Sequence, residues 1–91
     1  MIYKAIYAKN ALNQLKKFDK GVAKRILNKV RFYLDQDNPM QYAQKLQHPA
    51  FGEYRFRIGD YRVIFDVDKT GTIAILQILS IKHRKDIYKN L

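Results

Sequence analysis

Apolar residues recur along this chain with two different spacings, and the change from one to the other separates predicted helices from predicted strands. Residues 2–8 are rich in aromatic and branched side chains, which is typical of a strand. Apolar positions then return at intervals of three and four, which predicts an amphipathic helix over 11–18 and a second helix that ends near Asp35. Asp19 is the predicted N-cap of the second helix, so the two helices form a tight hairpin.

The second half of the chain changes to a spacing of two. The connector before it contains both prolines and little periodicity, and we expect a helical turn over 42–46. Apolar and charged residues then alternate over 54–58 and again over 61–67. Gly59 and Asp60 separate these two runs, so the pattern predicts a β-hairpin with a two-residue turn.

A last strand and the overall architecture follow from the same pattern. A second turn over 68–71 leads into 72–81, which is apolar on both sides and is therefore expected inside the sheet. Two amphipathic helices need an apolar surface to cover, and a curved, mainly antiparallel sheet of about four strands supplies it, with the first strand at an edge. We expect an α+β fold and one domain over residues 1–91.

Composition narrows the classes of function. The chain has no cysteine, which excludes disulfides and zinc sites built from thiolates. Its formal net charge of +10 favours a polyanion or an acidic protein as the partner. No apolar run is long enough to span a bilayer and the N-terminus lacks the apolar region of a signal peptide, so we expect a soluble cytoplasmic protein.

The predicted hairpin gathers three arginines. A two-residue turn at Gly59 and Asp60 places Arg57 directly opposite Arg62, and strand alternation puts Arg55 on the same face. Like charges opposite each other destabilise a sheet by up to about 1 kcal/mol, so a bound anion such as phosphate would explain them. The alternative is that they are solvent-exposed strand residues neutralised in part by Asp66.

The closing segment adds candidate chemistry. Lys82, His83, Arg84 and Tyr88 follow the last strand, and we expect them close to the three arginines. A histidine titrates near working pH, so His83 is a candidate general acid or base. The plainer alternatives are an exposed histidine and a tyrosine that anchors the tail in the core. Helix lysines are expected to be solvated, with long-range attraction of RNA as the lesser possibility.

A metal-free basic patch with a histidine and a tyrosine suits RNA cleavage by attack of the 2′-hydroxyl on the adjacent phosphodiester, because the carboxylates lack the spacing of a metal site. Over nearly its whole length the chain resembles the RelE/ParE superfamily of type II toxins. The strongest similarity lies in Tyr-Arg-Phe-Arg-Ile-Gly-Asp-Tyr-Arg-Val-Ile-Phe over 54–65 and His-Arg-Lys-Asp-Ile-Tyr over 83–88. The resemblance implies a RelE-like fold and, for the RelE branch, a ribosome-dependent endoribonuclease that cuts messenger RNA without metal or cofactor.

The resemblance also implies roles for the site residues. Arg57 and Arg62 would hold the scissile phosphate with support from Arg55, and His83 and Tyr88 would share proton transfer and base stacking, with the choice of base open. The cation of the closing segment would be Lys82 or Arg84, both treated as phosphate-binding candidates.

The partners implied by the resemblance are the ribosome, messenger RNA and an acidic, RelB-like antitoxin. A toxin that is monomeric alone and forms a hetero-oligomer with its antitoxin is expected. Two alternatives remain open: a ParE-like toxin that blocks DNA gyrase by protein contact without nuclease activity, and an inactive binding module of the same fold.

Overall fold

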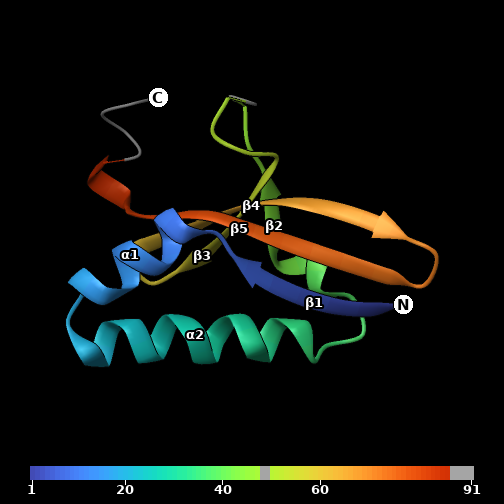
Figure 1. Cartoon of the computed structure of the whole chain (residues 1–91), viewed down its shortest axis with the longest axis horizontal. Coiled ribbons are helices and arrows are strands. Elements are labelled where there is room, and N and C mark those ends of the chain that lie inside the picture. The colour runs from blue at the N-terminus through green and yellow to red at the C-terminus, as the bar shows by residue number, and fades with distance from the viewer. Residues whose placement is uncertain (48–49, 87–91) are drawn as a thin grey trace.

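The chain folds into one five-stranded sheet with two helices packed against one side, as seen in a computed structural model that describes residues 1–47 and 50–86 (Figure 1). The expected α+β class is confirmed, with one more strand than predicted. In chain order the elements are β1 (Ile2–Tyr7), α1 (Lys9–Lys17), α2 (Lys20–Leu34), the 3-10 helix η1 (Pro39–Tyr42), β2 (Ala43–Lys45), β3 (Tyr54–Ile58), β4 (Tyr61–Thr70) and β5 (Ile73–His83).

The strand order is β1-β5-β4-β3-β2, so the hairpin strands occupy the middle of the sheet. β1 lies at an edge, as expected, and pairs in parallel with β5. All other neighbours are antiparallel. The last strand is enclosed by β1 and β4, which explains why both of its faces are apolar.

The additional strand corrects the interpretation of the connector. The helical turn expected over 42–46 is instead the short strand β2, and the helical turn lies earlier, at Pro39–Tyr42. Proline has its φ fixed near the helical value and needs no N–H partner at a helix start, so η1 begins at Pro39. β2 has only three residues and is defined by its pairing with β3. No local sequence pattern predicts this tertiary contact.

The second turn is also shorter than predicted. Residues 68–70, expected in a turn, continue β4 and pair with β5, and the chain reverses at Gly71, whose φ is +60°. Residues 68–73 are all exposed because the end of this hairpin extends beyond the helices. Without a buried face the hydrophobic alternation disappears, and the strand looks like a turn in the sequence.

The core lies between the helices and the sheet. Ile26, Val30 and Tyr33 of α2 are buried, as the predicted apolar stripe requires. Tyr33 packs on Phe56 with ring centroids 4.8 Å apart, and Phe56 packs on Phe65 at 4.5 Å. Each such buried side chain contributes about 1.5–3 kcal/mol. Asp19 holds the predicted N-cap position of α2 but makes no side-chain capping hydrogen bond.

Neither α1 nor α2, nor any other helix within the described ranges, combines the length and the apolar character that a membrane span requires.

Candidate functional site

The register of the β3–β4 hairpin is the one predicted from its turn. Arg57 pairs with Arg62, and Arg55 pairs with Ile64. Their neighbours Phe56 and Val63 lie in the core beneath the helices. Because side chains alternate across a sheet, the three arginines project from the other side, which we call the open face.

The next strand extends this charge across the sheet. Lys82 of β5 pairs with Arg62 of β4, which in turn pairs with Arg57 of β3. These three residues form a line across three adjacent strands, which we call the cation row. Strands lie about 4.8 Å apart, so the row concentrates positive charge within a short distance.

The sequence alone left two candidates for the cation of the closing segment. Lys82 lies in the cation row, whereas Arg84 lies at the end of the sheet beside the turn of the hairpin. The Arg84 backbone N–H donates to the Asp60 carbonyl oxygen at 2.7 Å, and its Nε lies 3.6 Å from the Asp60 carboxylate. Geometry therefore favours Lys82 as the partner of the arginines.

The members of the cation row differ in accessibility. Arg57 is exposed, and its side chain makes no hydrogen bond or ion pair with the described part of the chain. Arg62 is only 2% exposed, and its Nη1 donates to the carbonyl oxygens of Gly59 at 2.9 Å and Tyr61 at 3.0 Å. Arginine keeps its proton even when buried, so Arg62 both fixes the turn and adds positive potential from below the surface.

Arg55 is held by the strand that sequence analysis missed. Its Nε and Nη2 donate to the Gln44 side-chain oxygen at 3.3 and 3.0 Å, and Gln44 is its partner in β2. Asp66, the suggested counter-ion, instead accepts a hydrogen bond from the Glu53 backbone N–H at 2.9 Å. It forms no ion pair with Arg55 or Arg57 within the described residues. The carboxylate thus anchors the chain before β3.

Residues 46–47 and 50–53, between β2 and β3, lie on the open face and form a wall there (Figure 1). Leu46 and Phe51 pack against the fully buried Ile64 in a small second core. The Lys82 ammonium lies 5.6 Å from the centre of the Phe51 ring, a cation–π contact that holds the lysine beside the wall. The cation row therefore lies next to an aromatic side chain rather than on a flat surface.

His83 does not lie among the arginines, and the expectation that it would is wrong. It pairs with Tyr61 one position beyond Lys82, so the pleat directs it to the helix side of the sheet. Its ring meets the Tyr61 ring edge-on at 5.3 Å, and its Nδ1 accepts a hydrogen bond from the Lys85 N–H at 3.2 Å. Tyr88, the other proposed proton carrier, lies outside the described residues.

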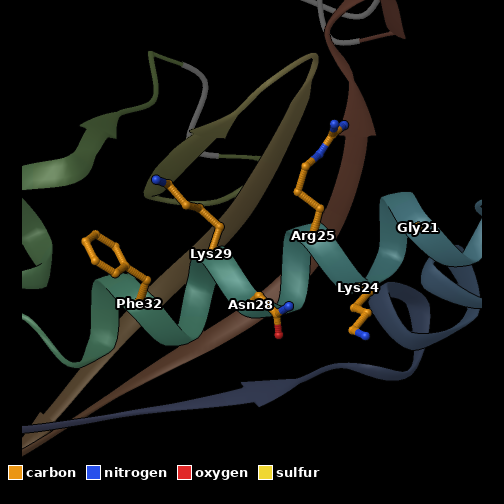
Figure 2. A pocket seen from close by; sticks show the side chains of 6 residues that line it. All are labelled: Gly21, Lys24, Arg25, Asn28, Lys29 and Phe32. Carbon is orange, nitrogen blue, oxygen red and sulfur yellow. The ribbon is translucent and has the colours of Figure 1, made fainter.

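A second basic surface lies on α2, on the side of the sheet opposite the open face. A cavity of about 480 Å³ opens there, and Figure 2 shows Arg25 and Lys29 reaching from the helix toward the sheet while Lys24 and Asn28 point elsewhere. The Lys29 ammonium lies 5.0 Å from the centre of the Phe32 ring. α2 carries five basic residues and no acidic one, so its exposed face is positively charged and attracts anions.

The family of the chain follows from a comparison of its sequence with family models. Residues 5–88 match the model described as ParE toxin of type II toxin-antitoxin system, parDE. The chain belongs to the ParE toxin family. This match confirms the resemblance to the RelE/ParE superfamily that the hairpin and the closing segment indicated. A search of curated proteins found no significant match.

Solved structures of toxins share the fold of this ParE-family chain. The RelBE2 toxin–antitoxin complex of Mycobacterium tuberculosis contains a chain 20% identical, with a TM-score of 0.68, covering 92% of this chain and 100% of that one. The archaeal RelE–RelB complex of Pyrococcus horikoshii gives 25% identity and a TM-score of 0.62 over 92% and 97% of the two chains. The RelB–RelE complex of Methanococcus jannaschii gives 25% identity and a TM-score of 0.52 over 94% and 98%.

Proposed function

We propose that this type II toxin is a ribosome-dependent messenger RNA endoribonuclease that works without a metal ion. The observation that carries the proposal is the cation row of Arg57, Arg62 and Lys82 across the open face. Two neighbours at 25% identity are described as RelE–RelB complexes, which supports the RelE-type interpretation.

The proposed reaction is a transesterification of the RNA backbone. The 2′-oxygen forms a bond to the adjacent phosphorus as it loses its proton, and the bond from phosphorus to the 5′-oxygen breaks as that oxygen gains one. Negative charge increases on the phosphoryl oxygens in the transition state, and guanidinium groups donate paired hydrogen bonds to such oxygens. Arg57 and Lys82 would bind this phosphate, Arg55 would support them, and Arg62 would strengthen the field from below.

The two candidate proton carriers, Tyr88 and His83, have different roles in this proposal. Tyr88 stays a predicted proton carrier. His83 belongs to the other side of the sheet end, so we assign it to a nucleotide next to the scissile phosphate rather than to the 2′-hydroxyl. Arginine is not a proton acceptor in proteins, so the proposal gives Arg57 no role as the base.

Mapping of RNA 5′ ends in a bacterial translation extract tests this function. We expect codon-phased cuts that require ribosomes, and no cut where the scissile nucleotide carries a 2′-deoxyribose. Arg57→Ala is the first variant, because Arg57 is exposed and its loss leaves the fold intact. Lys69→Ala is the matched control, since it removes one exposed cation at the far end of β4. Loss of cutting in the first variant alone would support the cation row as the phosphate site.

Inhibition of DNA gyrase is the second candidate, and the ParE family match is the observation that favours it. A gyrase inhibitor needs no phosphate site for RNA, so Arg57→Ala would leave it toxic. Intact messages together with trapped gyrase–DNA complexes in the same extract would contradict the nuclease proposal and support this alternative.

An acidic antitoxin is the partner that the surface fits. The similar structures from Mycobacterium tuberculosis, Pyrococcus horikoshii and Methanococcus jannaschii are all described as toxin–antitoxin complexes. We infer that this toxin, monomeric alone, forms a hetero-oligomer in the cytoplasm with a RelB-like antitoxin whose carboxylates neutralise its net charge of +10. Size-exclusion chromatography with light scattering of the toxin with and without antitoxin tests this.

A further inference from the structure

A second cavity lies on the helix side of the sheet, beside the end of β5 and behind the cation row. Its volume is about 430 Å³. The side chains that line it include Gln14, Lys17, Phe18, Tyr61, His83 and Asp86. They belong to α1, β4, β5 and the residues that directly follow α1 and β5, so elements distant in sequence meet there. Ile81 and Lys82, the latter a member of the cation row, complete the lining.

Three rings form the apolar part of this cavity. Tyr61 is central: its ring centroid lies 5.0 Å from that of Phe18, tilted by 52°, and 5.3 Å from that of His83, nearly perpendicular. All three side chains are half-buried, so each is fixed by its neighbours and still presents ring surface to the cavity. Aromatic rings in this state are the usual stacking partners of unpaired nucleobases.

Polar groups surround the rings with both donors and acceptors. The Gln14 side-chain oxygen accepts from the Ile81 N–H at 2.6 Å, which fixes the amide and leaves its NH₂ as a donor. The His83 Nδ1 accepts from the Lys85 N–H, so in the neutral ring the proton is on Nε2. The Asp86 carboxylate is exposed at the rim and makes no ion pair within the described residues. Lys17 and Lys82 add two cationic donors to the lining. Together these groups offer donors and an acceptor to the edge of a base.

The cavity and the cation row lie at adjacent register positions near the same end of the sheet. The pair Tyr61 and His83 is followed directly by the pair Arg62 and Lys82, and the pleat sends the two pairs to opposite faces. Lys82 borders both sites: it lines the cavity, and its ammonium lies over the Phe51 ring on the open face. An RNA strand with a phosphate on the cation row can therefore place a neighbouring base in the cavity.

We propose that this cavity binds a nucleobase of the RNA next to the cleaved phosphate, and that it prefers bases with an exocyclic amino group. The inference rests on the proposed nuclease function. Stacking on Tyr61 and His83 holds any base, and the Asp86 carboxylate accepts a hydrogen bond from the amino group of guanine, adenine or cytosine. Uracil has no amino group and would bind more weakly.

Titration of the full-length toxin with nucleosides that carry no phosphate separates this cavity from the cation row. In ¹H–¹⁵N spectra we expect saturable shifts at Tyr61 and His83, with guanosine and cytidine binding more tightly than uridine. His83→Ala should weaken nucleoside binding about fivefold or more, because stacking of one base corresponds to roughly 5–150-fold in affinity. Asp86→Ala should remove the preference over uridine, because alanine has no side-chain acceptor, and the exposed position of Asp86 makes a folding defect an implausible cause.

The outcomes distinguish this inference from the function on which it rests. Arg57→Ala should abolish RNA cutting and still bind nucleosides. Cutting by the native toxin, with unchanged nucleotide preference beside the cut in His83→Ala and Asp86→Ala, would overturn the base site and leave the nuclease. Nucleoside binding by a toxin that cuts no RNA would overturn the nuclease. Absence of nucleoside shifts, or shifts confined to residues outside the cavity, would overturn the base site.

Discussion

Gly52 is buried in the wall of the open face, in close contact with the sheet. Its φ is +144°, and a Cβ at this position would lie 2.6 Å from Ile64 Cγ2 and 3.3 Å from Leu79 Cδ1. Ile64 is fully buried and cannot move aside without opening the second core. Glycine is therefore required here by backbone conformation and by packing together.

We predict that Gly52→Ala lowers the free energy of unfolding by about 2–4 kcal/mol, since backbone strain and overpacking each cost roughly 1–3 kcal/mol. Urea denaturation followed by circular dichroism measures the loss. Gly71→Ala is the matched control, because Gly71 has φ +60° but no heavy atom lies within 4 Å of its added Cβ. It should lose only the strain, about 1–2 kcal/mol. Equal losses in the two variants would show that packing against Ile64 is unimportant.

Tyr7 makes the stability of the folded state depend on pH in the alkaline range. Burial raises the pKa of the Tyr7 phenol above its usual value of 10.0, and the Arg31 guanidinium opposes part of this rise. The folded state thus keeps a proton that the unfolded chain releases. We predict that the stability from this group is complete below about pH 10 and is lost as the pH rises through the higher pKa of the folded state.

Urea denaturation between pH 8 and pH 11.5 measures this loss, and Tyr7→Phe should make it shallower. Tyr33→Phe should act in the same direction, because burial and then the neighbouring Tyr42 raise the pKa of Tyr33 as well. A Tyr7→Phe variant whose stability falls with pH as steeply as that of the native toxin would show that another group sets the alkaline limit.

At the scale of the element, α1 completes an edge of the sheet that β1 leaves open. The pairing of β1 with β5 ends at Tyr7 and Ile78. Beyond it the Asn10 side chain donates to the Leu79 carbonyl oxygen at 3.3 Å, and the Gln14 side-chain oxygen accepts from the Ile81 N–H at 2.6 Å. Amide side chains of the helix therefore satisfy backbone groups that a longer strand would have paired.

We predict that Gln14→Leu lowers the free energy of unfolding by about 1–3 kcal/mol, because it leaves the buried N–H of Ile81 without its acceptor. Asn13→Leu, an exposed neighbour on the same helix, should change stability by less than about 0.5 kcal/mol. Hydrogen exchange gives a local measure: the Ile81 amide should exchange faster in the Gln14 variant. Unchanged protection of that amide would mean that another group has taken the place of Gln14.

Elements whose signal is local could be predicted from the sequence. The Gly59-Asp60 turn fixes the register of the hairpin by itself, so the shared face of Arg55, Arg57 and Arg62 was correct. The side of the sheet taken by His83 depends instead on the pairing of β4 with β5. That register contains an irregularity between Ile64 and Phe65 and starts from a turn at Gly71 rather than over 68–71, and neither feature has a local pattern.

At the scale of the whole molecule, positive charge lies on two opposite sides with the core between them. The cation row occupies the open face, and the basic residues of α2 line the helix layer. Charged residues that contact bound RNA mainly slow its dissociation. Charged residues that act only at a distance mainly raise the association rate constant. The two sides should therefore affect different rate constants, which gives a test of where RNA binds.

We predict that replacing Lys20, Lys24 and Lys29 of α2 with glutamine lowers the association rate constant for a short single-stranded RNA roughly fivefold at low salt and leaves dissociation unchanged. Stopped-flow fluorescence with RNA that carries 2′-deoxyribose at the scissile nucleotide measures both constants. The association rates should converge near 0.5 M salt, because screening then shortens the range of the field to about 4 Å. Arg57→Gln should instead raise the dissociation rate constant. Faster dissociation in the α2 variant would mean that the helix layer, and not the open face, contacts the RNA.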